Sequence, residues 1–276
     1  MSRFQILCVT MYQKDFTKIK TMNVNADIIY ANQDFVNSYS ELHFNSHIAK
    51  MITTNTRGVG TNRNIALMYA DADVCLFADD DVEYKGDLEQ IILDEFDNHK
   101  EADIFIFHLS TDDPVRKQKK YKKTRKISLW EQMPWGGFRI AIRLASVRRA
   151  NVWFSTLFGG GCIFPSGEDS LWLKDAKRKG LVFYVSDKTI GKVSFETSSW
   201  FEGRNEKYYY GQGAYARAAH RYFWRLRLIY YSLRTARNSM LTYVERMKWL
   251  SNGAKGYLKM LSYDEYMQDN RINEKK

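Results

Sequence analysis

A five-residue apolar run followed by three consecutive aspartates is the feature that most constrains the fold of this chain. The run is Val74–Ala78, and the aspartates are Asp79, Asp80 and Asp81. An unbroken apolar run of this length predicts a strand buried on both faces, as in a parallel sheet. In open sheets of this kind the ligand site lies beyond the carboxyl ends of the strands, which is where the aspartates fall.

The chemistry of the triplet points to a metal ion. Three adjacent carboxylates repel one another, so each resists ionisation unless a cation or hydrogen-bond donors compensate. Mg²⁺ and Mn²⁺ prefer oxygen ligands and bridge protein carboxylates to phosphates. The triplet therefore predicts a divalent metal site shared with a diphosphate, and the alternative is a solvated acidic turn after the strand.

The chain of 276 residues is long enough for one large α/β domain with an extension. Apolar strand-like segments alternate with segments of helical spacing over the first two-thirds, which predicts βαβ units and a mostly parallel sheet flanked by helices. We expect this domain over residues 1–200 and a basic, aromatic, helical extension over residues 201–276. The predicted strands are Phe4–Thr10, Ala26–Asn32, Ile48–Asn55, Val74–Ala78, Asp103–Leu109, Phe138–Leu144 and Leu181–Ser186. The predicted helices are Lys14–Met22, a helix that follows the turn Arg57–Asn64 and runs to Ala70, Leu88–Asn98 and Leu171–Lys179.

Two features bear on the cellular compartment. No apolar run is long enough for a bilayer-spanning helix, and the apolar segment Phe4–Val9 predicts a first strand, not a signal peptide. The cysteines Cys8, Cys75 and Cys162 are too widely spaced for a disulfide framework or a zinc site. Both features favour a cytosolic protein with reduced thiols.

Three motifs occur in a fixed order along the chain. Asn55–Leu67 contains a glycine turn and then Arg63-Asn64, Phe77–Asp81 ends in the aspartates, and Gly159–Gly161 is followed by Gly167-Glu168-Asp169. Together they resemble the Asn-x-x-Gly…Arg-Asn, DxD and Gly…Gly-Glu-Asp motifs of the family 2 glycosyltransferases with the GT-A fold. These are inverting enzymes that use nucleotide sugars, and the resemblance extends from about Phe4 to Trp200.

The resemblance implies roles for the aspartates and for an arginine near them. Asp81 would be the metal ligand, Asp79 would hold the metal and the neighbourhood of the ribose, and Asp80 would be the variable middle position on the donor side. The ion would be Mn²⁺ or Mg²⁺, acting as a Lewis acid on the leaving diphosphate. Arg63 would bind the nucleotide or diphosphate near the start of its helix, and its alternative is an exposed helix arginine.

The resemblance also places the nucleotide. Thr10 and Asp34 lie at or just past the ends of the first two predicted strands, where the family's pocket holds the base and the ribose. Uracil is the expected base, although Thr10-Met11-Tyr12-Gln13 departs from the family's usual Pro-x-Tyr/Phe-Asn.

On the acceptor side the resemblance makes Asp169 the general base. It would act on the face of the sugar opposite the leaving group, so that attack inverts the anomeric centre. Gly161 and Glu168 would contact the substrate nearby. The spacing Ser166-x-x-Asp169 also fits a helix capping box, and capping remains an alternative role for this carboxylate.

The segment after the last predicted strand departs from the family. Many relatives have a metal-binding histidine there, whereas Val193–Trp200 has none. Glu196 would replace it as an oxygen ligand or contact a sugar hydroxyl, with a plain salt bridge as the alternative. Trp200 is a further expected substrate contact.

Positive charge is concentrated in two regions. Arg116–Lys126 holds eight Lys and Arg residues among eleven positions, and residues 201–276 hold 15 Lys and Arg against 7 Asp and Glu. The first region predicts a flexible loop, either receiving an acidic or lipid-diphosphate acceptor or simply solvated.

In the second region the pattern predicts an amphipathic helix. Arg217, Arg221 and Arg225 form one stripe, and an apolar stripe of Tyr222, Leu226, Ile229 and Leu233 lies beside Phe223, Trp224 and Tyr230. Such a helix suits the headgroup region of an anionic membrane. Its alternative is packing on the catalytic domain or on a second copy.

The predicted function is a metal-dependent inverting glycosyltransferase. It would move a sugar from a nucleotide diphosphate-sugar, with UDP expected, to a hydroxyl of a glycan or lipid-linked acceptor. From the tendency of the family we expect bacterial surface polysaccharide synthesis by a cytoplasmic protein, peripheral at the inner face of the membrane. The alternative is a non-catalytic relative that binds a nucleotide sugar or glycan as a membrane-associated scaffold. Nucleic acid is not expected as a partner, because no recognised RNA or DNA module is present.

Overall fold

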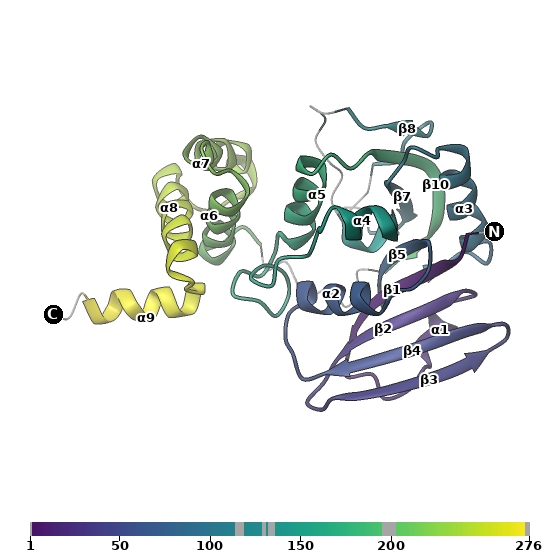
Figure 1. Ribbon diagram of the computed structural model, residues 1–276. Coiled ribbons are helices and arrows are strands. Elements are labelled where there is room, and N and C mark those ends of the chain that lie inside the picture. Colours follow the sequence, from purple (N-terminus) through teal and green to yellow (C-terminus); the bar gives the residue numbers. More distant parts are fainter. Residues whose placement is uncertain (1, 114–118, 129–130, 132–135, 195–202, 274–276) are drawn as a thin grey trace. The chain divides into compact units, whose positions relative to one another are not determined.

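The chain forms two compact units. The computed structural model describes residues 2–113, 119–128, 131, 136–194 and 203–273 (Figure 1). The first unit comprises Met1–Ser155 and Asp169–Thr197, and the second comprises Thr156–Glu168 and Ser198–Lys276. The short segment 156–168 therefore groups with the C-terminal part of the chain, whereas the predicted division at residue 200 placed it in the first domain.

A single mixed sheet runs through the first unit. Its strands are β1 (Phe4–Met11), β2 (Asp27–Gln33), β3 (Ser38–Phe44), β4 (His47–Thr54), β5 (Val74–Asp79), β6 (Val82–Tyr84), β7 (Ile104–Ser110), β8 (Arg125–Lys126), β9 (Ile140–Arg143) and β10 (Phe183–Val193). Among the described residues these ten strands form one sheet. Nine of them follow one another in the order β3-β4-β2-β1-β5-β9-β7-β10-β6, and β8 pairs with β10 beside this path. The strand pairings give β1, β2, β4, β5, β7 and β10 one direction and the other four the opposite direction. The predicted α/β class with a mostly parallel sheet is confirmed.

Helices cover both faces of this sheet (Figure 1). They are α1 (Lys18–Thr21), α2 (Val59–Tyr69), α3 (Leu88–Asn98), α4 (Leu144–Arg149) and α5 (Glu168–Arg178). Successive strand side chains point to opposite faces, so Ile6 and Cys8 belong to the cluster packed by α3, while Leu7 belongs to the cluster packed by α2, α4 and α5. Buried apolar residues on both faces explain why the central strands are continuous apolar runs.

Several predicted elements differ in extent or type. Helix α3 has the predicted bounds, but α1 is shorter than predicted, because the Asp15 carboxylate accepts hydrogen bonds from the Thr17 N–H and hydroxyl just before it begins. The predicted strand Phe138–Leu144 is a 3₁₀ turn (Gly137–Arg139), then β9, with α4 starting at Leu144. The end of the basic segment is not a loop, since β8 pairs with β10.

The three cysteines are free thiols, as predicted. Burial raises the pKa of Cys8 well above its usual range and that of Cys75 to about 12. Both side chains therefore stay protonated and pack as small apolar groups.

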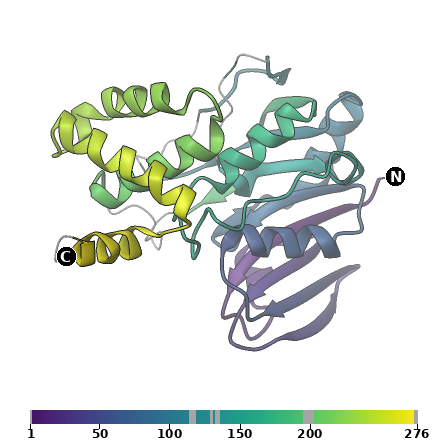
Figure 2. The same ribbon diagram turned by 60° about the vertical axis from the view of Figure 1, so that its left-hand side comes forward.

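The second unit is helical. It contains α6 (Glu206–Ala219), α7 (Trp224–Arg234), a 3₁₀ turn (Ala236–Asn238), α8 (Tyr243–Lys259) and α9 (Tyr263–Asn273), and α6, α7 and α8 pack against one another in both Figure 1 and Figure 2. Glycines allow α6 and α8 to approach closely, because a Cβ on Gly213 would lie 1.9 Å from the carbonyl oxygen of Leu250. None of the described helices is both long enough and apolar enough to cross a membrane.

Candidate active site

The aspartate triplet lies at the carboxyl end of β5, as its position after the apolar run predicted. Asp79 is the last residue of β5, and Asp80 and Asp81 form the turn into β6. Strands β1 and β5 are paired in parallel, so the end of β1 reaches the same edge of the sheet. This edge is where a doubly wound sheet binds its ligand.

Asp81 is the member of the triplet whose charge is least compensated. Its Oδ1 is buried and has no hydrogen-bond partner among the described residues. Loss of hydration, together with the nearby Asp79 and Asp80 charges, raises the pKa of Asp81 to about 7. A buried carboxylate oxygen with no donor has the properties required of a ligand for a hard cation.

Asp80 is held by two side chains from the first part of the chain. The Thr10 hydroxyl donates to its Oδ2 at 2.5 Å, and Lys18 Nζ lies 3.4 Å from the same oxygen. Lys18 Nζ also donates to the Asp80 carbonyl oxygen at 3.1 Å. Thr10 therefore lies beside the triplet, whereas Lys18 is a contact that the sequence pattern did not single out.

Arg63 joins the donor-side aspartates to the predicted base. Its Nη2 donates to Asp79 Oδ1 at 3.0 Å, and its Nη1 donates to Asp169 Oδ1. The guanidinium is 3% exposed and lies over the ring of Phe154, 5.4 Å from its centroid. Loss of hydration raises the pKa of Asp79, and the Arg63 charge opposes this shift. Arg63 is therefore not the exposed helix arginine of the alternative interpretation.

The second oxygen of Asp169 is bound by backbone. Oδ2 accepts the Gly137 N–H at 2.7 Å, so the carboxylate is oriented at both ends. The contact needs a glycine, because a Cβ on Gly137 would lie 2.6 Å from Asp169 Oδ1 and 2.8 Å from Arg63 Cζ. Gly137 belongs to none of the three sequence motifs, and the glycine pair Gly136-Gly137 is its only local signal.

A second buried arginine lies in the same region. Arg139 is 4% exposed and donates from Nη1 to the Phe107 carbonyl oxygen at 3.3 Å. Burial lowers its pKa to about 10, and the charge of Asp169 opposes that shift. Arg139 remains a cation at neutral pH and adds positive potential near the base.

Asp34 lies at the end of β2, where the resemblance placed the nucleotide pocket. Lys14 Nζ donates to its Oδ2 at 2.5 Å, and the Phe35 N–H donates to its Oδ1 at 2.7 Å. These hydrogen bonds hold the pKa of Asp34 below its usual range. Beside it Arg57 donates to the Tyr12 hydroxyl at 2.8 Å, and its guanidinium lies over the rings of Tyr12 and Phe35.

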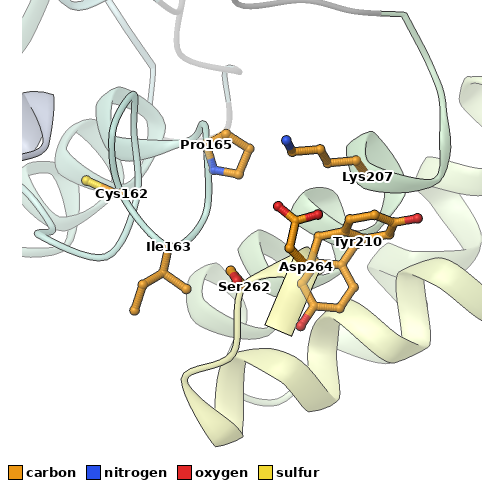
Figure 3. A pocket seen from close by; sticks show the side chains of 8 residues that line it. Cys162, Ile163, Pro165, Lys207, Tyr210, Ser262 and Asp264 are labelled. Carbon is orange, nitrogen blue, oxygen red and sulfur yellow. The ribbon is translucent and has the colours of Figure 1, made fainter. Parts of the chain in front are cut away.

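The second unit contains two of the predicted acceptor-side residues. Gly161 has φ of +76°, a left-handed conformation that favours glycine, and Glu168 is 8% exposed at the start of α5. The next residue along the chain, Cys162, lines a cavity of about 150 Å³. Figure 3 shows the amino group of Lys207 pointing toward Pro165 at this cavity. The lining residues are Cys162, Ile163, Pro165, Lys207, Tyr210, Ser262, Tyr263 and Asp264. It offers one positive and one negative side chain to a small polar group.

Two predicted residues cannot be placed. Glu196 and Trp200 lie outside the described residues. The last described backbone before them is next to the triplet, since β10 pairs with β6 through Val193 and Val82, and the Ser194 N–H donates to the Asp81 carbonyl oxygen at 3.4 Å. The predicted roles of Glu196 and Trp200 remain predictions.

The side chains of the described residues do not form a closed metal site by themselves. Within the described ranges, no group of three His, Cys, Asp or Glu residues lies close enough to hold a metal ion. Mg²⁺ is commonly bound through one or two carboxylates, with substrate phosphates and water completing its shell. Asp81 with its buried Oδ1, next to Asp79, fits that open arrangement.

Residues 32–154 match the model of glycosyl transferase family 2. This range includes Asp34, Arg63, the aspartate triplet and Gly137. The match covers less than half of the chain, and it makes this part of the protein similar to the family 2 glycosyl transferases. No curated protein sequence matches the chain.

Solved structures with this architecture include TarS from S. aureus. A crystal structure of TarS residues 1–349 aligns at a TM-score of 0.56 and 14% identity, covering 95% of this chain and 93% of that one. TarS 1–349 in complex with UDP-GlcNAc aligns at 0.51 and 16% identity, covering 94% of this chain and 73% of that one. A longer TarS structure aligns at 0.53 and 15% identity, with 95% of this chain and 44% of that one covered. At these identities the likeness establishes the fold.

Proposed function

We propose that this protein is a metal-dependent, inverting glycosyltransferase that transfers a sugar from a UDP-sugar to a hydroxyl of a glycan or lipid-linked acceptor. We further propose a role in bacterial surface polysaccharide synthesis at the inner face of the membrane. The observation that carries the catalytic part is the bridge from Asp79 through Arg63 to Asp169. The buried guanidinium of Arg63 thus links Asp79, at the proposed metal site, to Asp169, the proposed base.

In this proposal Asp169 accepts the proton of the acceptor hydroxyl as that oxygen attacks the anomeric carbon. Arg63 and the Gly137 N–H fix its orientation, and a carboxylate has about four lone-pair sites. Two hydrogen bonds therefore leave lone pairs for the acceptor proton. A base held by a rigid backbone contact keeps the reacting atoms aligned, and misplacement by about 1 Å costs about 100-fold in rate. The contacts of Asp169 support a role beyond helix capping.

On the donor side, Asp81 and Asp79 would hold Mn²⁺ or Mg²⁺ with the diphosphate. When bound, the ion supplies Lewis acidity to the leaving diphosphate. Arg63 and Arg139 add positive potential beside the cleaved bond, where negative charge grows in the transition state. Lys18 pairs with Asp80 and Arg63 pairs with Asp79, so Asp81 is the member of the triplet whose charge is left for a cation.

The choice of UDP has two supports. Two of the solved structures with the same fold are complexes of TarS, one with UDP-GlcNAc and one with UDP. In this chain Asp34 follows β2 as an ionised carboxylate, beside Lys14 and the group formed by Arg57, Tyr12 and Phe35. A carboxylate accepts hydrogen bonds from ribose hydroxyls, and exposed aromatic rings stack on a base.

The test compares two substitutions on purified protein. Binding of UDP-sugars with and without Mn²⁺ is measured by thermal shift, and transfer by release of UDP. Asp81→Ala is expected to abolish metal-linked donor binding, whereas Asp169→Asn is expected to keep that binding and lose transfer. Asp97→Asn, an exposed aspartate of α3, is the matched control and is expected to behave as wild type.

Each failure has a separate meaning. A panel of nucleotide sugars that shows no metal-linked binding would contradict the enzyme proposal. Metal-linked binding with no turnover in wild type, and no effect of Asp169→Asn, would instead support the non-catalytic scaffold.

A further inference from the structure

Helix α7 has one buried side and one exposed apolar side. Leu228 and Ser232 are buried within the second unit, and Arg246 of α8 donates to the Ser232 hydroxyl at 3.3 Å. Four exposed apolar or aromatic residues lie on the opposite side and two more lie in the turn just before the helix, and we call these six residues the α7 surface. They are Tyr222, Phe223, Leu226, Ile229, Tyr230 and Leu233. An exposed apolar surface of this kind marks an interaction site.

The segment of chain that carries this surface has only positively charged side chains. Residues 207–244 contain seven Lys and Arg residues and no Asp or Glu. The guanidinium-bearing residues Arg221, Arg225 and Arg234 of this stretch are exposed. A surface with exposed aromatic rings, leucines and only positive charges is complementary to an apolar layer bordered by anions.

The arginines and the rings are intermixed. Arg221 lies over the Tyr222 ring at 5.5 Å, Arg225 over Trp224 at 4.8 Å, and Arg234 over Tyr230 at 5.8 Å. Cation–π contacts of this kind let a guanidinium remain beside apolar surface while its N–H groups face outward to anions. Tyrosine and tryptophan rings favour the headgroup level of a bilayer because each has an apolar body and a polar group.

We propose that the α7 surface binds an anionic lipid bilayer at the level of its headgroups. The leucines, Ile229 and the aromatic rings would enter the boundary between headgroups and acyl chains, while the arginines pair with lipid phosphates. This inference deepens the proposed membrane location by naming the surface and the lipid charge. It is independent of the catalytic chemistry.

The test measures binding of the full chain to vesicles without nucleotide sugar or acceptor. Phosphatidylcholine vesicles are compared with vesicles that also contain phosphatidylglycerol, by flotation. The variant Leu226→Glu with Leu233→Glu changes two residues that are each 62% exposed. The control is Leu258→Glu on α8, which is 63% exposed and does not belong to the α7 surface. Helix content and melting temperature check that each variant is folded.

We expect wild type to bind the anionic vesicles and not the neutral ones. The double variant is expected to lose at least about tenfold in affinity, since it removes two apolar contacts and adds two negative charges. Leu258→Glu is expected to bind as wild type. Replacing Arg225 by Gln is expected to weaken binding about fivefold, the value of one arginine near an anionic surface.

Several outcomes would overturn the proposal. Equal binding to both vesicle types, no binding to either, or an equal loss in Leu258→Glu would each do so. A wild-type dimer that the double variant converts to monomer, measured by light scattering, would assign the surface to a second copy. Binding of RNA with no binding to vesicles would assign it to a nucleic acid. None of these results depends on transfer, so the transferase proposal is judged separately.

Discussion

Replacing Gly137 by alanine is expected to slow transfer strongly while leaving the first unit folded. A Cβ at this position would lie 2.6 Å from Asp169 Oδ1 and 2.9 Å from Arg63 Nη1. Real Cβ atoms essentially never approach closer than 3.0 Å, so the Asp169 carboxylate must move away. The same carboxylate accepts the Gly137 N–H, so its hydrogen bond at 2.7 Å is strained in the same step.

The size of the effect follows from this displacement. Overpacking by one methyl group costs about 1–3 kcal/mol in the free energy of unfolding. Misplacement of a catalytic group by a fraction of an ångström to 1 Å costs up to about 100-fold in rate. We therefore expect kcat of Gly137→Ala to fall about 10- to 100-fold, with donor binding retained because Asp81, the proposed metal ligand, is not among the nearest atoms that the added Cβ would meet.

The assay is UDP release at saturating donor and acceptor, with the melting temperature measured in parallel. Gly86→Ala is the matched control, because a Cβ there meets no atom within 4 Å. Wild-type kcat in Gly137→Ala, with a folded protein, would refute the claim that this backbone contact orients the base. An equal loss in Gly86→Ala would show that the effect is not local.

Four further predictions concern charge and packing. The affinity for Mn²⁺, measured by calorimetry with UDP present, is expected to fall about tenfold per pH unit below about 7, because the metal displaces the proton of Asp81; a pH-independent affinity from pH 5 to 8 would contradict this assignment. Without metal, the same raised pKa makes the folded state hold a proton that the unfolded chain loses near 3.8, so stability from this group is expected to fall as pH rises from about 4 to about 7. Arg63→Lys is expected to lower kcat by at least about 100-fold, because an ammonium cannot bridge two carboxylates as a planar guanidinium does; activity near wild type would contradict the bridging role. Gly213→Ala is expected to destabilise the second unit by at least about 1–3 kcal/mol in denaturant unfolding, because its Cβ would overlap the Leu250 carbonyl, and an unchanged midpoint would contradict the close helix packing.

The elements that could be predicted are those in which local pattern and burial coincide. The apolar run before the triplet is a central strand, and Leu88–Asn98 is a helix with the predicted bounds. β3 was not predicted because Ser38–Phe44 is an edge strand with almost wholly exposed side chains, so it has no apolar alternation to detect. β9 lies antiparallel between β5 and β7, an insertion that depends on contacts between distant segments and not on local spacing.

The same distinction applies to the site. The motifs singled out Asp79, Asp81, Arg63 and Asp169 as candidates, but they did not show that Arg63 contacts both Asp79, 16 positions away, and Asp169, 106 positions away. Gly137 was missed because its role depends on the close approach of side chains from two other segments. Such a contact leaves no periodic signal in the chain.

The Arg63 bridge has a consequence for how this enzyme can change. Because Asp79 and Asp169 share the Arg63 cation, a substitution at Asp79 changes the electrostatic surroundings of Asp169. A substitution at Asp169 likewise changes those of Asp79. Substitutions at Asp79 and Asp169 should therefore show strong epistasis in a double-mutant cycle. Exchange of donor specificity by recombination with relatives would then succeed only when Arg63 and both of its carboxylate partners are inherited together.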